Sequence, residues 1–103
     1  MEAAKPLVRL SNKIIEAIND TILSFDDEAK IRLFGSRTDT SARGGDIDLL
    51  ILSDKIEKEE ISRIKFHIFK LIGERKIDMV LSKKEIINPF VKIIYPKSVV
   101  LND

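Results

Sequence analysis

The chain has 103 residues, and its 18 Lys and Arg nearly balance its 17 Asp and Glu. A chain of this length forms one ordinary domain, so we expect residues 1–103 to fold as a single unit. The balanced charge disfavours a protein that holds long nucleic acid by neutralising its phosphates. The chain has no cysteine, which excludes disulfides and thiolate metal sites and fits a reducing compartment.

The sequence also lacks the pattern of an exported or membrane-spanning protein. Residues 1–6 (Met-Glu-Ala-Ala-Lys-Pro) are not followed by the apolar stretch of a signal peptide. No apolar run approaches the roughly eighteen residues that a membrane helix needs. We therefore expect a soluble, cytoplasmic domain with no membrane contact.

The first third of the chain predicts a helix followed by a strand. Apolar residues recur every three or four positions after Ser11, which is a suitable N-cap, and the predicted helix covers residues 11–24 and ends near Asp26. Residues 29–34 then alternate between apolar and charged, as in a strand with one covered face. Gly35 and Ser36 end this strand.

A polar loop leads from there into the most apolar part of the sequence. Residues 37–45 contain no hydrophobic side chain larger than alanine, so hydrogen bonds or a ligand must hold this loop. Residues 46–52 (Asp-Ile-Asp-Leu-Leu-Ile-Leu) predict a central strand whose first end reaches a site. The period of two places Asp46 and Asp48 on the same face of that strand.

The second half of the chain predicts two longer elements and several short ones. Asp54, with Glu57 three residues later, predicts the start of a helix that would end at Gly73. Residues 76–81 predict a strand. A short helix is expected from residues 83–85, another from Asn88 and Pro89, and an edge strand at residues 98–101.

Three carboxylates and a glycine-serine turn are the candidate functional residues. Asp46 and Asp48 repel one another unless a cation lies between them. Asp78 stands in an otherwise apolar strand, so it must be neutral, paired with Lys76 or Arg75, or bound to a cation. Two Mg²⁺ ions would need such carboxylates converging from adjacent strands.

Phosphate contacts are expected beside the carboxylates. Gly35 would allow close approach of the backbone to a phosphate, and Ser36 would offer its N–H and hydroxyl groups. Arg37 or Arg43 could neutralise a phosphate, although Arg43 is equally well explained as a solvated loop residue. His67 is more simply explained by a structural or exposed role than by catalysis. Tyr95 is more simply explained by packing than by a role as acceptor or base-stacking residue.

The combination of Gly35-Ser36, nine further residues, Asp46-Ile47-Asp48 and a later strand with Asp78 resembles the DNA polymerase β-like nucleotidyltransferase superfamily. The resemblance is to its smallest branch, the minimal nucleotidyltransferases, and covers most of the chain. It implies an α/β (α+β) fold, with a mixed sheet of three to four strands flanked by helices. Many members have ten residues rather than nine before the first aspartate, which affects only the shape of the loop.

The resemblance also implies the roles of the site residues. Asp46 and Asp48 would be metal ligands, and Asp78 would be the third carboxylate and general base. Gly35 and Ser36 would contact phosphate, with Arg37 in a less defined role. The implied activity is transfer of a nucleotidyl group from ATP or another nucleoside triphosphate to a hydroxyl, with Mg²⁺, two ions being expected.

Small members of the family resemble one half of a two-gene module. The implied partner is a helical protein, either a HEPN-type toxin RNase or a four-helix substrate-binding protein, and in the toxin pairs the nucleotidyltransferase is an antitoxin that adds AMP to a partner tyrosine. The alternative is a non-catalytic nucleotide-binding module that neutralises its partner by contact. Template-directed polymerisation is disfavoured by the balanced charge.

Overall fold

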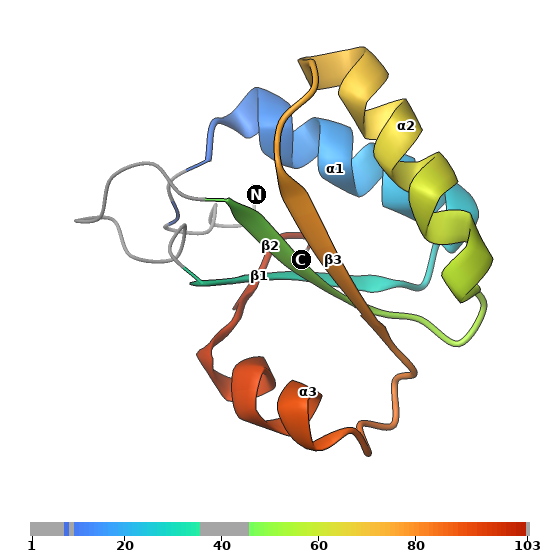
Figure 1. Ribbon diagram of the computed structural model, residues 1–103, viewed down its shortest axis with the longest axis vertical. Helices are drawn as coiled ribbons and strands as arrows, with labels where there is room; N and C mark the ends of the chain where they lie inside the picture. Colours follow the sequence, from blue (N-terminus) through green and yellow to red (C-terminus); the bar gives the residue numbers. More distant parts are fainter. Residues whose placement is uncertain (1–7, 9, 36–45, 103) are drawn as a thin grey trace, which may run out of the picture.

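A four-stranded mixed sheet forms the centre of the fold in the computed structural model, which describes residues 8, 10–35 and 46–102 (Figure 1). The strands are β1 (Lys30–Phe34), β2 (Ile47–Leu52), β3 (Ile77–Ser82) and β4 (Val99–Val100), in the order β3-β2-β1-β4. β2 and β3 are parallel, and the other two pairs are antiparallel. The expected mixed sheet is confirmed.

Helices cover both faces of this sheet. α1 (Asn12–Phe25) and α2 (Ile61–Ile72) lie on one face, and α3 (Pro89–Ile94) lies on the other (Figure 1). None of the helices in the described part of the chain has both the length and the apolar character needed to cross a bilayer.

Local capping signals explain where most of these helices begin and end. Ser11 Oγ accepts a hydrogen bond from the N–H of Ile14 at 3.3 Å, and the side chain of Asn88 caps α3 in the same way. Gly73 ends α2 with a φ of +85°, which glycine adopts without strain. The predicted caps at these three residues are confirmed.

Two expected helix starts are wrong. Asp54 does not cap α2, because its Oδ1 instead accepts the N–H of Lys84 at 3.0 Å. A short 3-10 helix, η2 (Lys58–Glu60), precedes α2, and a capping box joins Glu57 and Glu60. No helix forms at residues 83–85 either, where the backbone makes a bend.

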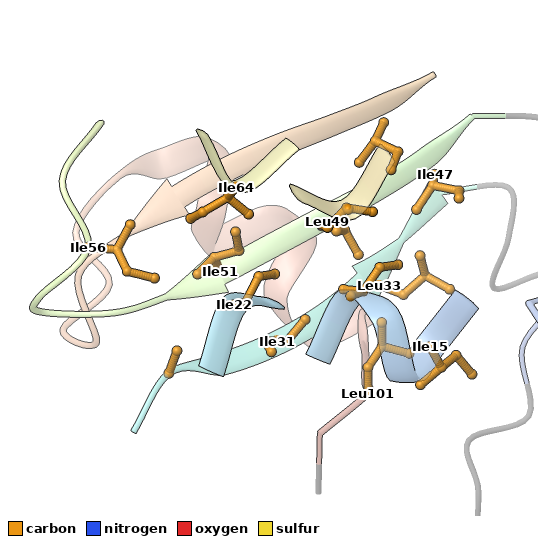
Figure 2. Packing of buried hydrophobic residues seen from close by; sticks show 14 residues of the cluster. Ile15, Ile22, Ile31, Leu33, Ile47, Leu49, Ile51, Ile56, Ile64 and Leu101 are labelled. Atoms are coloured by element: carbon orange, nitrogen blue, oxygen red, sulfur yellow. The ribbon is translucent and has the colours of Figure 1, made fainter. Parts of the chain in front are cut away.

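The main core lies between the sheet and the helices α1 and α2 (Figure 2). Leu49 and Ile51 of β2 point into this core, whereas Leu50 and Leu52 pack on the opposite face with residues of α3. β2 is therefore a central strand with both faces covered, as its continuous apolar sequence predicts. The alternation places Asp48 on the same face as Leu50, which is the α3 face.

A buried polar pair joins the end of α1 to the end of β2. Asp26 and Ser53 are 3% and 1% exposed, and Ser53 Oγ donates to Asp26 Oδ2 at 2.6 Å. Asp26 Oδ1 accepts the N–H of Glu28, and Ser53 Oγ accepts the N–H of Ile56. This network satisfies the buried polar groups and fixes the turn after β2.

Candidate active site

Two carboxylates face one another across neighbouring strands. In the parallel pairing of β2 and β3, Asp48 lies directly opposite Asp78. Side chains at paired positions of adjacent strands point to the same face of the sheet, so both aspartates lie on the α3 face. Asp48 is partly buried and Asp78 is exposed to solvent. The expected meeting of these two carboxylates from separate strands is therefore observed.

Burial and neighbouring carboxylates both disfavour the ionised form of Asp48. Burial raises the pKa of the Asp48 carboxyl above its ordinary value of 3.8. Repulsion from Asp78 and then from Asp46 raises this pKa further, as does a side-chain hydrogen bond with Asp78. Lys76 acts in the opposite direction. A cation beside Asp48 would relieve the repulsion and favour its ionised form.

Gly35 makes the close packing around Asp48 possible. It follows the last residue of β1 with a φ of +80°, a conformation that side-chain-bearing residues rarely adopt. A Cβ at this position would collide with Oδ2 of Asp48. The backbone conformation therefore favours glycine, and a larger residue would also displace the Asp48 carboxylate.

Asp46 lies just before β2, next to Lys76, which immediately precedes β3. Its Oδ2 is 3.4 Å from Nζ of Lys76, and the side chains of Lys76 and Asp46 are 71% and 43% exposed. Such exposed pairs contribute at most about 1 kcal/mol, so Asp46 can exchange this partner for another at little cost. The sequence pattern indicated Lys76 only as a partner for Asp78, so its pairing with Asp46 was not predicted.

Ser36, Arg37 and Arg43 lie outside the described residues, so their predicted phosphate contacts stay predictions. Within the described ranges, no three His, Cys, Asp or Glu side chains are grouped closely enough to hold a metal ion together. The convergence of Asp46 with Asp48 and Asp78 as metal ligands likewise stays a prediction.

The residues that are described fit a hard divalent cation. Carboxylate oxygens are the protein ligands that Mg²⁺ prefers. Asp48 and Asp78 present such oxygens side by side, and Gly35 leaves space against Asp48 that a side chain would fill. The exposure of Asp78 and Asp46 leaves their oxygens accessible from solvent.

Phe34, like Lys76, is a neighbour of the carboxylates that was not predicted from the sequence. It lies opposite Asp48 in the antiparallel pairing of β1 and β2, and its ring lies 6.4 Å from that of Phe90 on α3. The alternation in residues 29–34 could have shown that Phe34 shares a face with Arg32 rather than with the buried Leu33. It could not have shown which residue lies across from it.

Two residues set aside in the sequence analysis lie away from the carboxylates. His67 is exposed on α2, on the other face of the sheet, near the rings of Phe25 and Phe66. Tyr95 packs under the guanidinium of Arg32, which is 4.4 Å from the ring centroid. Both are accounted for by local contacts.

Comparison with known families agrees with this geometry. The family model described as a nucleotidyltransferase domain matches residues 12–101, from the first helix to the end of the last strand. The chain therefore belongs to the nucleotidyltransferase domain family, within the polymerase β-like superfamily. No curated protein matches the chain.

Membership defines the general chemistry. The chain is a transferase of the class that transfers nucleotidyl groups, and the family typically uses a nucleoside triphosphate and Mg²⁺.

Proposed function

We propose that this protein transfers a nucleoside monophosphate, AMP from ATP, to a hydroxyl group on a helical partner protein. The observation that carries the proposal is the direct pairing of Asp48 with Asp78 beside Gly35. The family match over residues 12–101 covers the nucleotidyltransferase domain itself. In this proposal the acceptor hydroxyl is presented by another molecule.

Different residues of the chain would bind the metal, contact the phosphates and accept the proton. Asp46, Asp48 and Asp78 would hold Mg²⁺, which supplies neutralisation of the triphosphate and of the charge that develops on it. Gly35 and Ser36 would place backbone N–H groups against the phosphates. Asp78, as the exposed carboxylate, would accept the proton of the acceptor hydroxyl.

The reaction balances without a further reactant. The acceptor oxygen forms a bond to the α-phosphorus, and the bond between that phosphorus and the α–β bridging oxygen breaks. The bond's electron pair leaves with pyrophosphate, and the hydroxyl proton passes to Asp78. The products are a phosphodiester-linked AMP on the partner and free pyrophosphate.

The partner proposed is a HEPN-type toxin RNase encoded by an adjacent reading frame, and this chain would be its antitoxin. The support is the resemblance of the chain to small nucleotidyltransferases found in such pairs. Modification of a tyrosine on the toxin would block its RNase activity.

Label transfer tests this proposal. Co-incubation of the protein with the product of the adjacent reading frame and α-labelled ATP should move label to that product. Asp46→Asn and Asp48→Asn should each abolish it, because each removes a charged oxygen from the site. Transfer that survives both substitutions would refute the proposal, and protection from the toxin by the double variant would favour neutralisation by contact alone.

A further inference from the structure

Large apolar side chains are exposed on and around α3. Among the described residues, six large hydrophobic side chains are exposed, and four of them fall within residues 87–95. Ile87, Phe90 and Ile93 are 75%, 51% and 62% exposed. Phe90 and Ile93 lie one turn apart on α3, and Ile87 lies just before its N-cap, Asn88. We call these three residues the α3 surface. Contiguous exposed apolar side chains of this kind mark binding sites more often than scattered ones do.

This surface begins next to the candidate catalytic carboxylates. Phe90 makes an edge-to-face contact with Phe34, at a centroid distance of 6.4 Å. Phe34 is the register partner of Asp48 across β1 and β2. A molecule seated on the α3 surface would therefore reach the edge of the carboxylate site.

The segment that carries the α3 surface is basic, and the carboxylates lie only beyond its Phe90 end, next to Phe34. Residues 83–98 contain four lysines and one glutamate, a net charge of +3, whereas the whole chain carries only +1. The ion pairs found in the described part of the chain do not include Lys92 or Lys97, and both side chains are exposed. A second copy of this chain would bring like charges together, so the surface is suited to an acidic partner.

We infer that the α3 surface docks the acceptor protein through an apolar patch bordered by Asp and Glu residues. This inference rests on the proposed function, because it assigns that surface to the partner that carries the acceptor hydroxyl. A protein is favoured over a nucleic acid since two of the three exposed side chains are isoleucines, which cannot stack on bases as aromatic rings do. Contacts with α3 would hold the hydroxyl beside Asp78.

Paired charge substitutions on two surfaces test this inference. Ile87→Glu/Ile93→Glu places carboxylates on the α3 surface. Phe66→Glu/Leu71→Glu is the matched control, because Phe66 and Leu71 are 60% and 56% exposed on α2, across the sheet. Binding to the product of the adjacent reading frame is measured by titration calorimetry without nucleotide, so that binding and transfer are separate readouts.

The expected result is a Kd raised at least tenfold by the α3 pair and changed less than twofold by the α2 pair. Lys92→Glu/Lys97→Glu, which leaves the apolar patch intact, should also raise the Kd, and the effect should shrink at high salt. Equal effects of the α3 and α2 pairs, or a wild-type protein that does not bind this product, would overturn the inference. Loss of affinity for a single-stranded RNA oligonucleotide, with protein binding unchanged, would assign the surface to nucleic acid instead.

The two proposals fail in different ways. Binding that depends on the α3 surface, without any label transfer, would contradict the proposed function and retain the docking surface. Label transfer that is unaffected by Ile87→Glu/Ile93→Glu would support the proposed function and contradict the assignment of the docking surface.

Discussion

Asp48 and Asp78 lie directly opposite one another on the parallel strands β2 and β3, although thirty residues separate them in the sequence. The crossover through α2 is the connection that parallel neighbours require, and it brings the start of β3 beside the start of β2. Two carboxylates in register on one face form an unfavourable pair in the absence of a cation. Their placement is therefore better explained by ligand binding than by stability.

Replacing Asp48 should stabilise the protein when no divalent cation is present. Because the pKa of Asp48 is raised in the fold, its ionised form destabilises the native state at neutral pH, and this penalty disappears as the pH falls below 3.8. Asp48→Asn should raise the free energy of unfolding by roughly 0.5–2 kcal/mol at pH 7 in EDTA. Urea denaturation measures this change.

Asp46→Asn is the control for that measurement. Replacement of Asp46 should give a smaller gain than Asp48→Asn, because Asp46 repels Asp48 less than Asp78 does and its own pairing with Lys76 is lost. If Asp46→Asn raised the free energy of unfolding as much as Asp48→Asn or more, the stabilisation would come from the change in net charge and not from relief of the Asp48–Asp78 repulsion.

Gly35→Ala should damage both the fold and the site. A methyl group would collide with Asp48 Oδ2, and the φ of +80° is unfavourable for alanine. We expect a loss of stability of about 1 kcal/mol or more and a fall in transfer rate of roughly a hundredfold. Thermal denaturation and initial rates of pyrophosphate release provide the two readouts.

Gly73→Ala is the control that introduces backbone strain without a collision of the kind that Gly35→Ala makes with Asp48. Gly73 has a φ of +85°, but a Cβ there would have nothing within 4 Å. This variant should lose a comparable amount of stability to strain and keep the wild-type transfer rate. A similar loss of rate in both variants would show that Gly35 acts through stability alone.

Removing the hydroxyl of Ser53 should destabilise the junction between α1 and β2. Ser53→Ala leaves the buried Asp26 carboxylate without its 2.6 Å donor, and it removes the acceptor for the N–H groups of Lys55 and Ile56. The expected cost is about 1–3 kcal/mol in the free energy of unfolding. Ser62→Ala, at an exposed position of α2, should change it by less than about 0.5 kcal/mol.

Asp26 should also give the protein a defined acid sensitivity. The hydrogen bond from Ser53 lowers the pKa of Asp26 below 3.8, more than its burial raises it, and the N–H of Glu28 and the charge of Lys55 assist. The stabilisation by Asp26 is therefore present above pH 3.8 and lost as the pH falls through the lowered pKa. The stability difference between wild type and Asp26→Asn, measured by urea denaturation, should shrink below pH 3.8.

Arg32 should be sensitive even to a conservative change. Its Nε and Nη2 atoms donate to Ser98 Oγ and O at 2.6 and 3.1 Å, and its guanidinium lies over the ring of Tyr95. Lysine cannot reproduce this planar two-point contact. Arg32→Lys should cost about 1–2 kcal/mol in thermal or urea unfolding, and Lys30→Arg on the same strand should be neutral.

The elements with strong local signals could be predicted from the sequence. Ser11, Gly73 and Asn88 fix helix ends through bonds or dihedral angles within a few residues of themselves, so their roles are visible locally. The alternation around Ile31 and Leu33 and the continuous apolar run of β2 likewise predict a covered strand and a central one. Asp48 and Asp78 were identified because charge is unusual in such strands.

The features that were missed depend on contacts between distant residues. Asp54 has the side chain of a helix cap, but a bond from the N–H of Lys84, thirty residues later, determines its role. Lys76 pairs with Asp46 only because two strands run parallel and in register. The exposure of Ile87 and Ile93 depends on how α3 lies on the sheet, since the same residues would suit a buried face.

The rate of label transfer from α-labelled ATP to the partner, compared among single variants of the two paired aspartates, tests the central claim most directly. Asp48→Asn and Asp78→Asn should each lower it by roughly a thousandfold or more, and the double variant should be little worse than either, because the carboxylates act as a unit. Asp54→Asn, an exposed aspartate beyond the other end of β2, should retain the wild-type rate. Transfer that persists within tenfold of wild type in Asp48→Asn or Asp78→Asn would contradict the assignment of this pair as the catalytic centre.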